Sequence, residues 1–347
     1  MESALEAALE VASCDRCDRD SVIHQPYSGL HLCGRHLGRS IRKRVSKALR
    51  AQIDLSNEVA AARGRPFTLL VAVSGGKDSA VLLHGLVELI GPRPDVELIA
   101  GVVDEGIAGY RSPSIECAAS LCDSLAIRLE RISYTDLGFA EMDDVVDRMA
   151  GIATRHKEAR GMLACSYCGV FRRQGINALA KRVDADWVAM GHNLDDVAQS
   201  VLMNLQRGDI DRTVRLAPHT DQPIDGLTPR IVPLRWIPEQ EVHALALHLG
   251  LPFHHGDCPY APGALRQRNR DFIAALEADV PGSRHGLVHS LDRLKEMGRR
   301  VREVGSEEAG SVESVASAKV GRCDSCGEIT SRQICQACSM KAWLEEE

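Results

Sequence analysis

Short apolar runs alternate with longer amphipathic segments through the middle of the chain. The apolar runs are rich in Val, Ile and Leu, and the segments between them repeat their apolar positions with helical spacing. The expected strands and helices are, in order, strands at 66–73, 96–106, 126–132 and 185–190, and helices at 77–90, at 114–125, after Cys168 and from Asn193. This alternation predicts an α/β fold built on a doubly wound parallel sheet.

The two ends of the chain differ from this middle. Residues 1–38 hold Cys and His pairs among turn residues, and residues 320–347 hold two CxxC pairs. Both patterns predict small metal-binding modules. Residues 303–319 are small, polar and acidic, as in a flexible linker. We therefore expect a catalytic domain over 39–302, entered through an amphipathic helix at 40–62.

Composition narrows the class of protein. The chain has no apolar run long enough to cross a membrane and no signal-peptide pattern, so we expect no membrane association and a cytoplasmic location. Twelve cysteines in such a chain indicate metal sites or catalysis and argue against a disulfide framework.

The net charge and the distribution of charge along the chain point to different partners. A formal net charge of −6 argues against a nucleic-acid partner. However, the stretch 35–50 (RHLGRSIRKRVSKALR) contains only basic charges. It predicts either a local electrostatic footprint for nucleic acid or a solvated helix face.

The segment VAVSGGKDSAVL carries the clearest chemistry. It lacks the upstream glycine of a Walker A loop, G-x-x-x-x-G-K-[ST]. Its glycines follow a strand and open a helix, a turn whose N–H groups can surround a phosphate. Lys77 would neutralise phosphate charge and Asp78 could hold Mg²⁺. The candidate ATP-binding residues here are Ser74, Gly75, Gly76, Lys77, Asp78 and Ser79.

Two cysteine groups have zinc-like spacing. At the N-terminus Cys14 and Cys17 are followed by Cys33 and His36, although His24 and His31 could compete for the fourth position. Tight Cys pairs closed by a second pair are typical of tetrahedral Zn²⁺. The C-terminal group has two CxxC pairs, and we expect a second zinc there, bound by Cys323, Cys326, Cys335 and Cys338.

A third cysteine group is incomplete. Cys165 and Cys168 form a pair in the central domain, and Cys258 is a plausible third partner, whereas Cys117 and Cys122 lie in an expected helix and suit the core. Three thiolates suit a [4Fe-4S] cluster with one iron left open. The alternatives are catalytic cysteines, one carrying a persulfide, or a structural role for the pair.

The combined motifs resemble the TtuA/NcsA family of tRNA 2-thiouridine synthetases. This family belongs to the PP-loop ATP pyrophosphatases and includes the eukaryotic cytosolic wobble-uridine thiolase. The motifs span nearly the whole chain. They are the two terminal metal modules, VAVSGGKDS, VDEGIAGYR (103–111), CSYCGVFRR (165–173), GHNLDDVAQSVLMNLQRGD (191–209) and DCPYAP (257–262).

The resemblance implies a mechanism. ATP adenylates O2 of a uridine, sulfur displaces AMP, and the three central cysteines hold a [4Fe-4S] cluster whose open iron can carry hydrosulfide. Asp104, Gly191 and His192 would line the nucleotide pocket.

Three further residues are candidates for catalysis. Arg172 would stabilise charge near the α-phosphate, because its guanidinium stays protonated. Asp195 and Asp196 would orient Mg²⁺ or the uridine, or else cap the helix that they begin.

The resemblance also implies the partners. The substrate would be tRNA, gripped by the basic stretch 35–50, the zinc modules and Arg266, Arg268 and Arg270. Inorganic sulfide, a thiocarboxylated ubiquitin-like protein or a persulfide could donate sulfur, and the chain would suit a homodimer. The motifs look closer to the wobble-uridine (U34) branch, of archaeal type, than to the branch acting on U54. The rival functions are another PP-loop ligase and a zinc-ribbon RNA-binding protein without activity.

Overall fold

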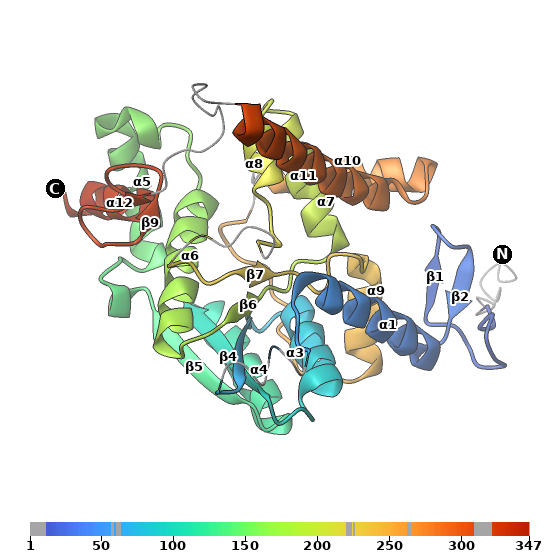
Figure 1. The fold of residues 1–347 in the computed structure, drawn as a ribbon. Helices are drawn as coiled ribbons and strands as arrows, with labels where there is room; N and C mark the ends of the chain where they lie inside the picture. Colours follow the sequence, from blue (N-terminus) through green and yellow to red (C-terminus); the bar gives the residue numbers. More distant parts are fainter. Residues whose placement is uncertain are drawn as a thin grey trace, which may run out of the picture.

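The protein forms a layered α/β domain (Figure 1). Near each end lies a group of four side chains that could hold a metal ion. The computed structural model describes residues 12–56, 59, 64–219, 224, 226–261, 265–308 and 321–346. Within these residues, no helix is long and apolar enough to cross a membrane.

The centre is a five-stranded parallel sheet in the order β5-β4-β3-β6-β7. From β3 the chain adds β4 and β5 on one side and then returns to place β6 on the other. A crevice forms at such a reversal, outside the carboxyl ends of the strands. The strands are β3 (Phe67–Ala72), β4 (Val96–Asp104), β5 (Arg128–Ser133), β6 (Trp187–Ala189) and β7 (Arg230–Ile231). The predicted doubly wound sheet is therefore confirmed.

Helices cover both faces of this sheet, because successive side chains of a strand point to opposite faces. Leu69 and Val71 of β3 pack with α1, α3, α4 and α9, whereas Leu70 packs with α5, α6 and α12. A third cluster joins α7, α10 and α11. The helices are α1 (Gly34–Gln52), α3 (Lys77–Ile90), α4 (Arg111–Ser124), α5 (Met142–Arg155), α6 (Ala164–Arg182), α7 (Leu194–Leu205), α8 (Ile210–Val214), α9 (Glu239–His248), α10 (Leu265–Asp279), α11 (Ser283–Glu308) and α12 (Gln336–Glu345).

Two short hairpins accompany the metal-ligand groups. Strands β1 (Ile23–Gln25) and β2 (Leu30–Leu32) pair in the N-terminal module, and β8 (Gly321–Arg322) and β9 (Ile329–Thr330) pair in the C-terminal one. Short 3-10 turns lie at Thr135–Leu137 and Lys157–Ala159.

Three element boundaries differ from those expected. Helix α1 begins at Gly34, directly after Cys33, and ends at Gln52, so metal ligands replace Ser40 as its starting point. Helix α6 begins at Ala164, which places Cys165 and Cys168 inside the helix instead of before it. Helix α11 continues to Glu308, into the expected linker, and residues 309–320 lie outside the described residues.

Arg44 belongs to the basic stretch 35–50 but does not face solvent with its neighbours. Its guanidinium forms an ion pair with Glu241, whose side chain is 2% exposed, and donates to the carbonyl of Trp236 at 3.2 Å. The hydroxyl of Tyr27 donates to the same carboxylate at 2.5 Å. Arg44 therefore fastens α1 to α9 and is not available for RNA.

We expect Arg44→Ala to lower the free energy of unfolding by about 3 kcal/mol, because it leaves the buried Glu241 carboxylate without its cation. The measurement is urea unfolding followed by tryptophan fluorescence. The exposed neighbour Arg42 is the control, and Arg42→Ala should change stability by no more than about 0.5 kcal/mol. Equal effects of the two substitutions would contradict this role of Arg44.

Candidate active site

The loop SGGKDS lies at the reversal of strand order, between the end of β3 and the start of α3. Gly75 has φ +82°, and a Cβ there would come within 1.8 Å of the carbonyl oxygen of Ser114. The Ser74 N–H donates to Ser79 Oγ at 3.1 Å, which closes the loop. Gly76 precedes α3 without a side-chain cap, so the first N–H groups of the helix are open to an anion.

Two other segments of the chain donate hydrogen bonds to backbone carbonyls of this loop. Arg111, the first residue of α4, donates from Nη1 to the Ser74 carbonyl at 2.7 Å and to Ser114 Oγ at 3.0 Å. The backbone N–H of His254 donates to the Gly75 carbonyl at 2.8 Å. Because His254 precedes Cys258 by four residues, the segment that carries this cysteine is attached directly to the loop.

Lys77 and Asp78 sit in a network of polar contacts. Lys77 Nζ lies 3.0 Å from Asp78 Oδ2 and 2.8 Å from Glu239 Oε1, and Asn193 Nδ2 donates to Asp78 Oδ1 at 2.9 Å. Burial by itself would lower the pKa of Lys77, but attraction to Asp78 and Glu239 raises it above its ordinary value. Burial raises the pKa of Asp78 despite the nearby Lys77 cation. A further cation beside Asp78 would therefore stabilise its charged form.

Asp195 and Asp196 already have partners. Asp195 pairs with Arg284 at 2.5 Å and accepts the Glu239 N–H at 2.8 Å, so its 13% exposed side chain ties α7 to α9 and α11. Asp196 forms a capping box with Asn193 and pairs with Arg266 at 2.9 Å. Asp196 therefore caps its own helix, as acids at a helix start commonly do, whereas Asp195 joins its helix to two others. Asp196 also lies close enough to act electrostatically on Asp78.

Residues 191 and 192, which follow β6, lie against the SGGKDS loop, which follows the neighbouring strand β3. A Cβ at Gly191 would lie 3.3 Å from the Ser79 nitrogen, so this glycine lets the two segments approach closely. His192 is solvent-accessible but crowded by protein. Desolvation lowers its pKa, and Arg266 and Arg230 oppose its protonation.

A cavity of about 220 Å³ opens at the carboxyl ends of β4 and β5. Asp104 lies in its wall, where it accepts the Gly106 N–H at 3.1 Å and pairs with Arg131. Arg111 lines the same cavity and braces the loop, so the cavity and the loop share a wall.

The three central cysteines approach one another at the start of α6. Burial raises the pKa of Cys165, and negative charge on Cys168 and Cys258 raises it further. The Cys168 sulfur accepts from Arg172 Nη2 at 3.1 Å, and Cys165 Sγ lies 3.8 Å from the carbonyl of Tyr260. Among the described residues, the three do not form the close grouping that one ion requires. A larger iron–sulfur cluster fits three thiol donors spaced more widely.

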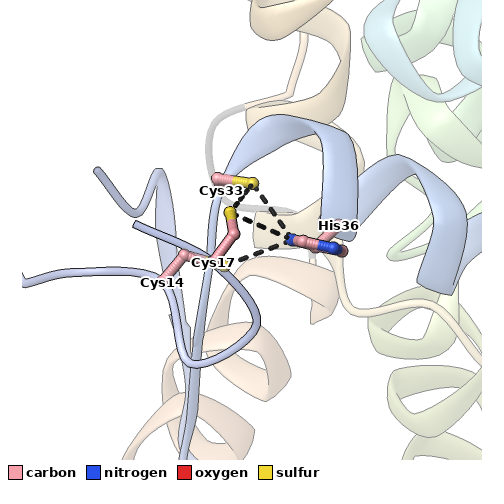
Figure 2. A group of neighbouring side chains, drawn as sticks. All are labelled: Cys14, Cys17, Cys33 and His36. Carbon is pink, nitrogen blue, oxygen red and sulfur yellow. Dashed lines mark hydrogen bonds between the residues drawn. The ribbon is translucent and has the colours of Figure 1, made fainter. Parts of the chain in front are cut away.

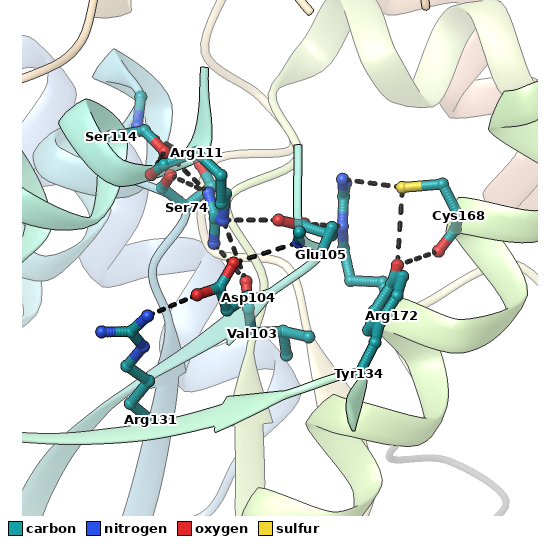
Figure 3. A network of polar contacts seen from close by, with 12 residues as sticks. Ser74, Val103, Asp104, Glu105, Arg111, Ser114, Arg131, Tyr134, Cys168 and Arg172 are labelled. Atoms are coloured by element: carbon teal, nitrogen blue, oxygen red, sulfur yellow. Dashed lines mark hydrogen bonds and ion pairs between the residues drawn. The ribbon is translucent and has the colours of Figure 1, made fainter. Parts of the chain in front are cut away.

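A buried carboxylate connects these cysteines to the loop (Figure 3). Glu105 is 3% exposed, accepts from Arg172 Nε at 2.7 Å and forms an ion pair with Arg111. Contacts therefore run from Cys168 through Arg172, Glu105 and Arg111 to Ser74.

Sequence reasoning missed Glu105, Arg111, Asn193 and Glu239 as site residues. The first three lie inside the motifs quoted above, but the motifs do not reveal which residues they contact. Glu239 lies in WIPEQE and offers no local signal.

The two terminal groups have the geometry of single-ion sites. The ligand atoms of Cys14, Cys17, Cys33 and His36 all lie within 4.8 Å of one another. Figure 2 shows these four side chains gathered at the start of α1. His24 and His31 instead stack on each other across the hairpin, with ring centroids 4.4 Å apart. The C-terminal group, also within 4.8 Å, consists of Cys323, Cys326, Cys335 and Cys338. Four thiolate or imidazole donors at such distances fit a tetrahedral Zn²⁺ ion.

We expect His36→Ala to lower the zinc content from two ions to one per chain, because it removes one of four ligands from the N-terminal group. Elemental analysis of the purified protein measures this directly. His31→Ala, which removes a histidine of the same module from outside the group, should keep both ions. Loss of zinc from the His31 variant alone would contradict the assignment.

Comparison with known proteins identifies the family of the chain. The N-terminal LIM domain of 2-thiouridine synthetase TtuA matches residues 13–37, and the PP-loop domain matches residues 48–257. The tRNA 2-thiolation protein NcsA of Haloferax volcanii is 37% identical over 96% of this chain and 99% of its own. Cytoplasmic tRNA 2-thiolation protein 1 of Bos taurus is 34% identical over 96% of this chain and 87% of its own.

A solved structure is similar over nearly the whole chain. The U34-tRNA thiolase NcsA from Methanococcus maripaludis, with its [4Fe-4S] cluster, superposes with a TM-score of 0.73 at 31% identity. The match covers 94% of this chain and 95% of that one. The chain therefore belongs to the TtuA/NcsA-type PP-loop tRNA thiolase family.

Proposed function

We propose that the protein is an ATP-dependent tRNA sulfurtransferase that activates O2 of a uridine as its adenylate and replaces that oxygen with sulfur. Its relatives are named for tRNA 2-thiolation. The observation that carries the proposal is the line of contacts from Cys168 to Ser74, which joins a thiol site to a phosphate-binding loop.

The loop would serve the first step. Uridine O2 attacks the α-phosphorus of ATP, the bond to the β-phosphate breaks, and pyrophosphate leaves. The open N–H groups at the start of α3 would hold the pyrophosphate, and Lys77 would offset its charge. Asp78 would hold Mg²⁺, which fits a partly buried carboxylate whose pKa is raised.

Arg172 would act on the adenylate, which forms in the first step and is consumed when sulfur replaces the oxygen. Its guanidinium carries a fixed positive charge held between Glu105 and Cys168, and it remains cationic at any working pH. That charge would stabilise the adenylate phosphate, which leaves as AMP with the uridine oxygen when sulfur bonds to C2. Because hydrosulfide supplies both electrons of the new bond, the exchange needs no oxidant or reductant.

Cys165, Cys168 and Cys258 would hold the [4Fe-4S] cluster. When bound, the cluster supplies an iron without a protein ligand, at which sulfide can bind. Cys168 is positioned for this by Arg172 and by the hydroxyl of Tyr134, which donates to the Cys168 carbonyl at 2.9 Å. The Cys258 segment reaches the loop through His254.

The wobble uridine U34 is our proposed target, because the relative of known structure is described as a U34-tRNA thiolase. We further propose Zn²⁺ in both terminal groups, sulfide or a thiocarboxylated ubiquitin-like protein as the donor, a homodimer, and a cytoplasmic location as for the bovine relative.

We expect Glu105→Gln to lower the single-turnover rate constant for thiolation about 100-fold, because the neutral side chain no longer holds Arg172 and Arg111 in position. The measurement is single-turnover thiolation, with iron and zinc quantified in the same sample. Glu130→Gln, on the outer strand β5, is the matched control and should keep full activity. Normal activity of the Glu105 variant, or a loss explained by missing iron, would contradict the positioning role.

We expect Cys258→Ala to lose iron while keeping both zinc ions, because its thiol completes the central group and neither terminal one. Metal analysis after anaerobic purification measures both. Cys117→Ala, a half-buried cysteine of α4, should retain iron. Full iron in the Cys258 variant would remove it from the cluster site and favour a catalytic persulfide.

The proposed function is tested by incubating iron-reconstituted protein anaerobically with unmodified tRNA, Mg-ATP and sulfide, and mapping 2-thiouridine by mass spectrometry. Thiouridine at U34 is the expected result. Thiouridine at U54 would keep the chemistry and overturn the target. No thiouridine despite bound cluster and ATP turnover, with a thiocarboxylated donor protein also supplied, would contradict the function.

A further inference from the structure

A group of arginines borders the active site where α6, β7 and α8 meet. Arg230, the first residue of β7, donates from Nη2 to Asn177 Oδ1 at 2.9 Å, while its buried Nε has no hydrogen-bond partner. Asn177 lies one helical turn after Arg173 on α6. The contact therefore brings Arg230 beside the exposed face of α6 that carries Arg173.

The segment after α8 closes the group from a third side. The His219 N–H donates to the Arg230 carbonyl at 3.0 Å, and the His219 ring contacts the Arg215 carbonyl at 3.0 Å. These contacts fix the end of α8 next to β7. Helix α8 also carries Arg212, whose side chain is exposed.

These cations lack the carboxylate partners that other arginines have. In the described part of the chain, no ion pair involves Arg173, Arg212 or Arg230, whereas Arg44 and Arg284 are paired with acids. Desolvation and then the charge of Arg173 lower the pKa of Arg230 to about 10. Desolvation and then Arg212 lower the pKa of Arg173. Cations that repel one another without a counter-charge suit a polyanionic ligand.

These three arginines lie next to the candidate active site. Arg173 directly follows Arg172, which contacts Cys168. Arg230 lies close enough to His192 to oppose its protonation, and His192 follows the strand next to β3. A ligand bound to these arginines would therefore lie close to the thiol site and to residues 191–192, which approach the loop.

We propose that Arg173, Arg212 and Arg230 bind successive phosphates of the tRNA strand next to the target uridine. The inference rests on the proposed function, since it assumes that the anion is tRNA. A base that leaves its stack must have its flanking backbone held in place. Planar guanidinium groups suit this task because each can donate two parallel hydrogen bonds to a phosphate. Such contacts position the strand and do not read its sequence.

The test compares Arg173→Gln/Arg212→Gln with the wild-type protein, both with cluster and zinc bound. We measure Kd for unmodified tRNA over a range of salt concentrations, and repeat it with a stem-loop RNA that carries the target uridine. The double variant should bind both RNAs about tenfold or more weakly. The slope of log Kd against log salt should fall by about 1.4, since each single-strand phosphate contact contributes about 0.7. KM for tRNA should rise, while kcat and KM for ATP stay unchanged.

Arg128→Gln/Arg155→Gln is the matched control, because it removes two exposed arginines from β5 and α5. Its Kd and salt slope should match those of the wild type. Wild-type binding by the Arg173/Arg212 variant would overturn the proposal. So would weaker binding of whole tRNA with unchanged binding of the stem-loop, which would place the contacts away from the target.

Arg230→Gln alone tests the half-buried member and should lower affinity in the same direction. Unchanged affinity would remove Arg230 from the group. These binding results are independent of thiolation. A wild-type protein that binds tRNA through these arginines but makes no thiouridine would overturn the proposed function and leave the phosphate contacts standing.

Discussion

The buried carboxylate of Glu105 holds the active site together. A charge that is 3% exposed is costly to desolvate, and here two guanidinium groups on opposite sides compensate for it. Arg172 reaches from this carboxylate to the Cys168 sulfur, and Arg111 reaches to the Ser74 carbonyl. The distance between the thiol site and the phosphate loop is therefore set by one ion-pair network and not by a flexible segment.

Strand order brings the remaining parts to the same place. Because the order of the parallel strands reverses between β3 and β6, the loop after β3 and residues 191–193 after β6 meet at one crevice. The Cys258 segment joins them through the hydrogen bond from His254 to Gly75. The proposed adenylation of uridine and delivery of sulfur would need such closeness, because a closed site protects a reactive intermediate from hydrolysis.

Local patterns predicted the fold and the metal groups, whereas long-range contacts escaped prediction. The strand–loop–helix unit around Gly75 and the cysteine pairs are set by residues close in sequence, and each was recognised. The pairing of Glu105 with Arg172 joins residues 67 positions apart, which no spacing reveals. Arg44 looked like its exposed neighbours because only the folded chain places Glu241 beside it. The start of α1 was misplaced because metal ligands, rather than Ser40, mark it.

The central claim is that O2 of the uridine is adenylated before sulfur replaces it. The most direct measurement uses tRNA whose target uridine carries a heavy oxygen isotope at O2. After single-turnover thiolation with Mg-ATP and sulfide, AMP is isolated and its mass determined. The account predicts one labelled oxygen in AMP for each thiouridine formed. Unlabelled AMP, with the isotope released to water or pyrophosphate, would contradict it.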